Sequence, residues 1–196
     1  GASVVLAGCC TATRTDLLRQ AGGIPTRTIT EDMDWTWTLQ EQGWVTAYVP
    51  QAVVYTAEPK SVKLMAKQLN RWSSGFFQNL RHHRLSNLWR HRPMLGMWVT
   101  LSIVEILSIP VWLAAGAWML YWRGWQGLAL WIVLDLALML PHVAAGVRSR
   151  GLSVAHVTSC LLFVFLNRFM NMYFVWKALV SELILKKPLV EFEKGH

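Results

Sequence analysis

Charged side chains are scarce in this chain, and acidic ones are the scarcest. Only 15% of its 196 residues are charged, with 11 Asp and Glu against 19 Lys and Arg, and the mean hydropathy is +0.31. This composition is too apolar for an ordinary soluble domain of this size, and long apolar runs after Pro93 are its source. The sequence therefore predicts a membrane protein.

Cysteine is also sparse, which limits the chemistry that thiols could support. An adjacent pair, Cys9 and Cys10, and Cys160 inside an apolar run give neither a metal-ligand spacing nor a disulfide framework. We expect all three to be small buried hydrophobes in a reducing compartment. The chain has no initiator Met and no signal-peptide pattern, so we expect a fragment, or a subunit whose other half lies on a separate chain.

Acidic residues are nearly absent where basic residues are densest. Much of the formal charge of +8 lies just before the first apolar run, where only Glu58 offsets the positive side chains. These are Lys60, Lys63, Lys67, Arg71, Arg81, Arg84, Arg90 and Arg92. A nucleic-acid surface is the usual alternative for such a cluster, but the adjoining apolar run favours lipid headgroups at a cytoplasmic membrane face. We therefore expect membrane lipid as a partner and no nucleic acid.

Short β-like runs alternate with helical patterns before Pro93. Val4–Ala12 is typical of a buried strand, Trp44–Val49 of a half-buried strand, and Ala52–Ala57 is another β-rich run. One helix is expected near Thr15 and stops at Gly22-Gly23, and a second runs from Thr30, whose hydroxyl can cap it, to Gly43. From Ser61 the apolar residues recur with a helical period, which predicts an amphipathic helix suited to a membrane surface.

Three apolar runs are each long enough to cross the hydrocarbon layer, which takes about 20 helical residues. They are Met94–Tyr121, Gly127–Val147 and Val154–Leu185. The basic stretch before Pro93 is expected inside and the turn at Arg123 outside. In the last run a single crossing competes with a break near Asn167 that would return the tail to the cytoplasm. Each half of that run is too short to span alone, which favours three crossings.

Two blocks of polar residues carry the candidate chemistry. The first is Thr-Glu-Asp-Met-Asp at 30–34, and the second is Gln-Leu-Asn-Arg-Trp at 68–72. Helix capping alone would account for the acids of the first block, because the helix dipole favours negative charge in the first turn. A core or interface aromatic alone would account for Trp72. The order and spacing of the blocks, followed by apolar helices, make the combination specific.

Together the two blocks resemble the Thr-Glu-Asp and Gln-x-x-Arg-Trp motifs of membrane-bound, processive family-2 glycosyltransferases. These inverting enzymes include cellulose, chitin, hyaluronan and poly-N-acetylglucosamine synthases. The resemblance runs from about Gly8 to about Arg92, and more loosely through the apolar runs. It implies transfer of a hexose or N-acetylhexosamine from a UDP-sugar to a growing polysaccharide, coupled to export. The protein would be a multi-pass protein of the cytoplasmic membrane, and the neighbourhood of Asp34 is nearer to the poly-N-acetylglucosamine synthases than to the cellulose branch.

The resemblance also implies a fold, α/β plus membrane α. Residues 1–59 would be the C-terminal part of a GT-A catalytic domain, a nucleotide-binding α/β sandwich. Residues 60–92 would be amphipathic interface helices, and residues 93–196 the transmembrane region. In the family the Asp-x-Asp that binds a divalent metal, Mg²⁺ or Mn²⁺, comes earlier, so we do not interpret Asp32-Met33-Asp34 as a metal site. The donor-binding half is expected upstream or on a separate chain, and no metal ligand is expected in this one.

Roles for single residues follow from the same resemblance. Asp32 would be the base that takes the proton of the attacking hydroxyl, with Glu31 and Thr30 shaping its surroundings. Arg71, assisted by Gln68, would bind the leaving diphosphate, because a guanidinium forms bidentate bonds with it. Trp72 would pack against the apolar face of the acceptor sugar.

Two alternatives from other classes remain open. The chain could be a non-catalytic membrane subunit or remnant that lacks the donor-binding half. It could also be a basic amphipathic anchor that binds headgroups or a partner protein. For such an anchor, charge-conserving replacement of Gln68, Arg71 and Trp72 would leave function intact.

Three charges inside the apolar runs need a separate explanation. Glu105, Asp135 and Arg168 fall near mid-membrane, where an unpaired charge costs at least about 2.5 kcal/mol. They should therefore face each other or water. One interpretation is a structural ion pair, most simply between Arg168 and Asp135. The other is a channel, in which these groups, with Asn167 and Asn171, replace water around the sugar hydroxyls of an exported polymer.

Overall fold

The computed structural model describes residues 4–49, 51–149, 151 and 153–190. Two compact units make up the chain. The first unit comprises Gly1–Ile103 and Tyr173–His196, and the second comprises Val104–Met172. Among the described residues the regular secondary structure is helical and contains no strand.

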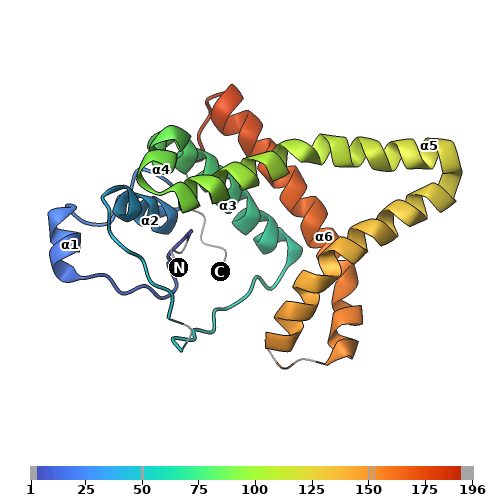
Figure 1. The fold of residues 1–196 in the computed structure, drawn as a ribbon, viewed down its shortest axis with the longest axis horizontal. Coiled ribbons are helices and arrows are strands. Elements are labelled where there is room, and N and C mark those ends of the chain that lie inside the picture. The colour runs from blue at the N-terminus through green and yellow to red at the C-terminus, as the bar shows by residue number, and fades with distance from the viewer. Residues whose placement is uncertain (1–3, 50, 150, 152, 191–196) are drawn as a thin grey trace. The chain divides into compact units, whose positions relative to one another are not determined.

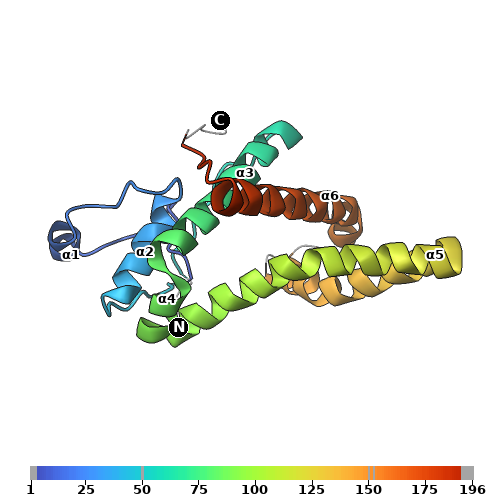
Figure 2. The same ribbon diagram turned by 90° about the horizontal axis from the view of Figure 1, so that it is seen from above.

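The first unit is built around one long amphipathic helix, α3 (Figure 1). Its elements are α1 (Thr15–Gln20), α2 (Glu31–Glu41), α3 (Val62–His83), α4 (Leu85–His91), the start of α5 (Pro93–Ser149), the end of α6 (Val154–Ala178) and the π-helix η1 (Leu179–Ile184). α3 contacts α2, α4 and η1, and Figure 2 shows it from above between α2 and the end of α6. α3 therefore joins the N-terminal segment of this unit, through α2 and α4, to its C-terminal segment, through η1.

The expected helices before Pro93 are confirmed, and local chemistry accounts for their ends. The Ser61 hydroxyl accepts a hydrogen bond from the Leu64 N–H (3.3 Å) and so caps α3. α2 ends just before Gly43, whose φ of 88° lies in the left-handed region that favours glycine. These signals are local in sequence, which is why the pattern of residues was sufficient to predict them.

The expected strands are wrong for the described residues. A strand needs a neighbouring strand to bond its backbone N–H and C=O groups. Here the segment 4–8, which is neither helix nor strand, lies against α2 instead: the Leu6 N–H donates to Thr36 Oγ1 (2.8 Å), and the Trp37 indole N–H donates to the Val4 carbonyl (3.1 Å). The α/β part of the expected fold class is therefore absent from the part of the chain that the structure describes.

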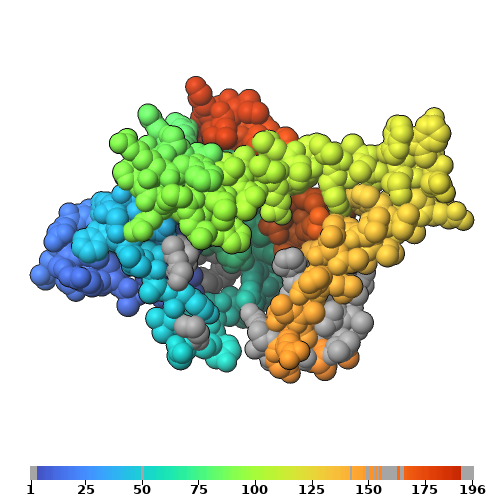
Figure 3. Space-filling view, viewed as in Figure 1, coloured from blue at the N-terminus to red at the C-terminus, as the bar shows by residue number. Residues whose placement is uncertain are grey.

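The β-like runs after Gly43 lie on the surface of the first unit (Figure 3). Val45 is 82% exposed and Tyr55 is 95% exposed, so these apolar side chains have no core to enter among the described residues. The expected burial of Cys9 and Cys10 is wrong for the same reason, because both lie exposed in the segment that follows residue 8. The side chain of Cys160 lies outside the described residues.

A small apolar core fixes α2 against α3, α4 and α5. Its fully buried members are Trp37, Leu88, Leu95 and Val99, and around them pack Val4, Met33, Phe76, Leu80, Leu85 and Ile103. Trp37 meets Phe76 of α3 edge to face, with ring centroids 6.3 Å apart. Complete burial of a side chain of this kind stabilises a fold by about 1.5 to 3 kcal/mol. The core therefore holds the start of α2 in a defined position beside α3.

A helical hairpin forms most of the second unit. The helix α5 is interrupted at Gly124, where φ is 57° and ψ is −148°, and the chain turns back there (Figure 1). The two legs meet at Gly116, where an added Cβ would lie 2.9 Å from the Trp131 ring. Trp112 packs against the same ring at a tilt of 42°, with centroids 4.0 Å apart. A small residue thus allows close packing of the two legs.

One helix in the described part of the chain, Pro93–Arg148, has the length and apolar composition to cross a membrane. Gly124 divides it between the first two predicted spans. The third predicted span corresponds to α6, which ends at Ala178 and continues as η1. Three crossings therefore stay a prediction.

Candidate active site

Asp32 lies in the first turn of α2, partly buried beside Gly8. Its Oδ2 accepts a hydrogen bond from the Gly8 N–H (3.0 Å), and its Oδ1 accepts one from the N–H of Met33 (2.8 Å). An added Cβ at Gly8 would lie only 3.3 Å from the same Oδ2, so the backbone approaches closely there. Each carboxylate oxygen has a second lone pair. Asp32 is therefore held in one orientation and can still accept a proton.

Thr30 occupies the N-cap position of α2, but its hydroxyl does not cap the helix. The capping expected from the sequence is wrong because a tertiary partner takes the hydroxyl. Thr30 Oγ1 accepts a hydrogen bond from Asn79 Nδ2 on α3 at 2.9 Å, and Asn79 is completely buried. Glu31, the next residue, is exposed. Thr30 thus connects the first block to α3, while Glu31 faces solvent.

Gly75 is the point at which α3 touches this turn. A Cβ added at Gly75 would overlap Oγ1 and Cγ2 of Thr30 and would lie 2.8 Å from its Cβ. Asn79, one helical turn after Gly75, also donates from its side-chain amide to the Gly75 carbonyl (2.8 Å). Only glycine at position 75 allows α3 to lie this close to Thr30.

The residues of the second block precede Gly75 on the same helix. Arg71 lies four residues before Gly75, which places it on the same helix face roughly 6 Å along the axis. Gln68 and Arg71 are partly buried, and Trp72 is 50% exposed. The structure thus brings the helix of the second block against the turn of the first. The contact itself is made by Gly75 and Asn79, which the sequence analysis did not identify.

A buried charge network, also missed from the sequence, joins α2 to the end of α3. Asp34 has no exposed surface, and the Arg27 guanidinium donates to both of its oxygens, from Nε to Oδ2 (2.9 Å) and from Nη2 to Oδ1 (2.8 Å). His83 Nε2 lies 2.8 Å from Asp34 Oδ1, and His83 Nδ1 lies 2.8 Å from Glu41 Oε2. Because both ring nitrogens face carboxylates, His83 is held as the doubly protonated cation.

The pKa values of the network follow from this geometry. Burial alone would raise the pKa of Asp34, but hydrogen bonds from His83 and Arg27 outweigh it and hold that pKa well below its usual range. Burial alone would lower the pKa of His83, but its bonds to Asp34 and Glu41 raise it above the ordinary value. Asp34 is therefore ionised and fully engaged, and it is not an available metal ligand. Across the described residues no group of three or more His, Cys, Asp or Glu side chains could hold a metal ion.

In the second unit, the predicted pair between Arg168 and Asp135 is confirmed. Arg168 Nη2 lies 2.9 Å from Asp135 Oδ1, and the Trp112 indole N–H donates to the same oxygen (3.1 Å). The guanidinium also lies over the Trp112 ring, 4.8 Å from its centroid. Asp135 is 4% exposed. Its Oδ2 and the Arg168 Nε are buried and have no hydrogen-bond partner among the residues that the structure describes.

The other charged and amide residues of the apolar runs are not part of this pair. Asn171 Nδ2 donates to the carbonyl of Asn167 (3.0 Å) and to its side-chain oxygen (3.2 Å), one helical turn away. Glu105 is exposed. The structure therefore groups the five predicted channel residues into one ion pair, one amide pair and one separate carboxylate.

Comparison with known proteins assigns the family. The model of the family described as glycosyl transferase family group 2 matches residues 1–180. The chain belongs to this family, which confirms the glycosyltransferase family 2 part of the resemblance, while the membrane-bound, processive branch stays a prediction.

Several curated relatives share part of the sequence. The chain is 34% identical over 84 residues to the uncharacterized glycosyltransferase YaiP of Escherichia coli (strain K12), across 43% of this chain and 21% of that protein. It is 34% identical over 74 residues to cellulose synthase 2 of Novacetimonas hansenii, across 38% of this chain and 5% of that protein. A putative cellulose synthase 2 of Komagataeibacter xylinus is 33% identical over 89 residues, which cover 45% of this chain and 5% of that protein. No solved structure matches the chain.

The buried network predicts a defined pH dependence of stability. The raised pKa of His83 contributes stability that is complete below about pH 6.5 and is lost as pH rises through the folded-state pKa. The lowered pKa of Asp34 contributes stability that is present above about pH 3.9 and is lost as pH falls through its folded-state pKa. We expect His83→Gln to reduce the free energy of unfolding by about 1.5 to 3 kcal/mol near pH 5.5, and by less at pH 9.

Denaturant unfolding of the wild type and of His83→Gln from about pH 5.5 to about pH 9 measures the difference in their free energies of unfolding. His91→Gln, at an exposed position, is the matched control and should leave the profile unchanged. A difference between wild type and His83→Gln that does not vary with pH would contradict the charged state assigned to His83.

Proposed function

We propose that this chain forms the base and acceptor side of an inverting glycosyltransferase that extends a polysaccharide from a nucleotide sugar. The observation that carries the proposal is the contact between the turn of the first block and the helix that bears the second. Asp32 stands oriented at the start of α2, and the helix that bears Gln68, Arg71 and Trp72 lies against the preceding Thr30 through Gly75. Membership of glycosyl transferase family group 2 supports this chemistry.

Inverting transfer requires a base on the acceptor side of the sugar carbon. In the proposal, Asp32 accepts the proton of the acceptor hydroxyl while that oxygen bonds to the sugar carbon and the nucleotide diphosphate leaves with the bonding electrons. The two N–H groups at Gly8 and Met33 fix the carboxylate without using all of its lone pairs. Glu31 and Thr30 shape the same turn, Glu31 toward solvent and Thr30 toward α3.

The second block supplies the complementary groups. The Arg71 guanidinium would bind the negative charge that grows on the leaving diphosphate, and Gln68 would assist through its amide. The half-exposed indole of Trp72 offers an apolar surface for the C–H face of the acceptor's terminal sugar. A divalent metal, Mg²⁺ or Mn²⁺, would neutralise the diphosphate, and the proposal assigns its ligands to the donor-binding, GT-A part of the enzyme.

We further propose that the enzyme acts at the cytoplasmic face of the inner membrane, uses a UDP-sugar and exports its product. In the most apolar 18-residue stretch of α5 only 6% is buried. The core helix of a soluble protein would be mostly buried. The basic residues of 60–92 precede this helix and suit anionic headgroups. Relatives named as cellulose synthases support a polysaccharide product, and an N-acetylhexosamine or a hexose would be the unit added.

The polar groups of the second unit give this proposal a candidate export path. Among the described residues the buried Asp135 Oδ2 and Arg168 Nε find no hydrogen-bond partner, and such atoms gain from hydrogen bonds with a passing hydroxyl. Asn167 and Asn171 add amide groups on α6, and Glu105 adds a carboxylate on α5. Sugar hydroxyls would exchange water for these partners during transit.

The assignment of Asp32 is tested by Asp32→Asn in the full-length protein. The amide keeps the shape of the side chain but cannot take a proton, so turnover should fall by about a hundredfold or more while nucleotide-sugar binding is retained. Radiolabelled sugar incorporation and donor binding are the two measurements. Asp16→Asn, at an exposed ion pair with Arg14, is the matched control and should transfer sugar normally. Near-wild-type turnover in Asp32→Asn would leave the proposed base without support.

The export path is tested by the double variant Arg168→Gln with Asp135→Asn. This change removes both charges together and so leaves no orphan charge, unlike Arg168→Gln alone, which should reduce abundance. A channel role predicts normal abundance and normal transfer in detergent, with polymer export from intact vesicles reduced severalfold. A purely structural ion pair predicts normal export in the double variant, and that result would end the channel proposal.

A further inference from the structure

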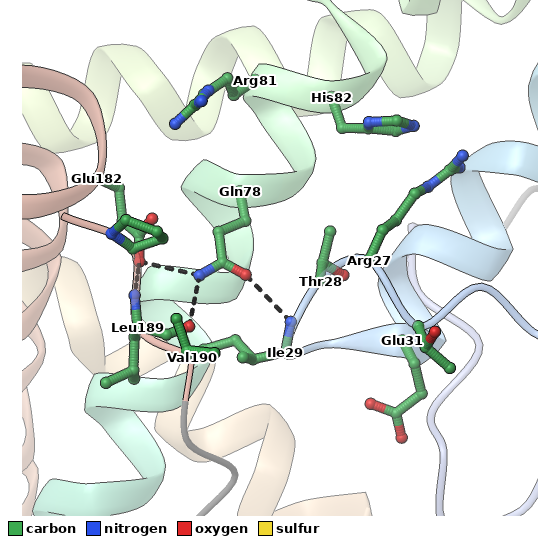
Figure 4. A pocket seen from close by; sticks show the side chains of 12 residues that line it. Arg27, Thr28, Ile29, Glu31, Gln78, Arg81, His82, Glu182, Leu189 and Val190 are labelled. Atoms are coloured by element: carbon green, nitrogen blue, oxygen red, sulfur yellow. Dashed lines mark hydrogen bonds between the residues drawn. The ribbon is translucent and has the colours of Figure 1, made fainter. Parts of the chain in front are cut away.

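Gln78 makes hydrogen bonds to three separate segments of the first unit (Figure 4). Its Oε1 accepts from the backbone N–H of Ile29 (3.1 Å), the residue immediately before the first block. Its Nε2 donates to Glu182 Oε1 on η1 (3.0 Å) and to the carbonyl of Leu189 (3.0 Å). One side-chain amide therefore connects α3, the entry to α2 and the end of the described chain.

The partners of Gln78 determine which way its amide points. Both N–H bonds are directed at acceptors, a carboxylate and a carbonyl, and the amide oxygen faces a donor. The reversed amide would place an oxygen against two acceptors and a donor against the Ile29 N–H. Glu182 is 1% exposed, and its Oε1 also accepts from the Leu189 N–H (2.9 Å), which keeps the carboxylate in place. The amide oxygen is thus fixed toward Ile29.

The same junction borders a cleft that reaches the first block. The cleft has a volume of about 550 Å³, and its lining includes Glu31 and Ile29 on one side, Gln78 on α3, and Leu189 and Val190 on the other (Figure 4). Ile29 is three residues before Asp32 in a segment without regular structure. Its backbone position therefore depends on tertiary contacts, of which the bond to Gln78 is one and the Thr30 to Asn79 bond is the next.

We propose that Gln78 is a positioning residue for the Thr30-Glu31-Asp32 turn. Gln78 and the adjacent Asn79 hold the two successive residues Ile29 and Thr30 from one helix, and so set where Asp32 stands relative to Arg71. Glu182 and Leu189 act through Gln78 by keeping its amide oxygen toward Ile29. This inference rests on the proposed function, because it assigns a consequence for transfer to the position of Asp32.

The decisive variant is Gln78→Met, which keeps length and volume but removes all three bonds. We expect turnover per folded enzyme to fall about tenfold or more, with the KM for the donor changed by less than about twofold, since small displacements of a reacting group are costly to the rate. Amide hydrogen exchange at Ile29, measured without substrate, should become faster. Gln42→Met, at an exposed position on the C-cap of α2, is the matched control and should match the wild type in both measurements.

A second variant, Gln78→Met with Glu182→Leu, separates positioning from folding. Replacing both the partly buried Gln78 and the buried Glu182 by apolar groups removes the unpaired carboxylate, so abundance should recover even where Gln78→Met alone folds poorly. Turnover should stay about tenfold low, because Ile29 is still untethered. Recovery of turnover together with abundance would overturn the proposal.

The two proposals fail in different ways. Faster exchange at Ile29 with normal turnover in Gln78→Met would overturn the role of Gln78 and leave Asp32 as the base. Normal turnover in Asp32→Asn would overturn the proposed base, and the exchange measurement on Gln78→Met would still report the geometry of the turn.

Discussion

The close approach of Gly75 to Thr30 is the constraint on which the candidate site depends. Because position 75 has no side chain, α3 can lie directly against the turn that begins α2. Asn79 then reaches Thr30, and Gln78 reaches Ile29, so that two adjacent residues of the turn are bonded to two adjacent residues of α3. Arg71, one helical turn before Gly75, is placed on the same face by the helix itself. The contact at Gly75 and the two hydrogen bonds beside it thus place the helix of the second block against the turn of the first.

Buried charge and apolar packing also hold α2 against the C-terminal half of α3. Asp34 carries an ion pair with Arg27 and a hydrogen bond with His83, and Trp37 packs against Phe76 and the His83 ring. Removing one partner of such a network would leave a buried charge unpaired, which costs more than the pair contributes. α2 is therefore held along its length, and the relatively accessible Asp32 at its start is the exception. Asp34 is fully engaged whereas Asp32 is partly exposed, and this contrast supports the proposed role of Asp32 as the base.

Local patterns predicted much of this, and their limits are physical. The helix ends at Ser61 and Gly43 depend on neighbouring residues, so the sequence alone was sufficient to predict them. The strands were wrong because a strand also depends on a partner, and residues 4–8 pair with α2 side chains instead. Thr30 was expected to cap its own helix, but Asn79, far away in sequence, took the hydroxyl. The contact between Asp34 and His83 joins residues 49 apart in the sequence, and no periodic pattern of residues indicates it. The ion pair between Arg168 and Asp135 could be predicted, because both charges lie in apolar runs and have opposite signs.

The most direct measurement is sugar-transfer turnover of Gly75→Ala in the full-length protein, compared with Gly146→Ala. Both glycines lie inside helices, but an added Cβ meets Thr30 at position 75, and at position 146 it meets no atom of the described residues within 4 Å. The account predicts that Gly75→Ala lowers turnover per folded enzyme at least about tenfold, because α3 must move away from the Asp32 turn, while Gly146→Ala behaves as the wild type. Wild-type turnover in Gly75→Ala would contradict the claim that this contact assembles the site.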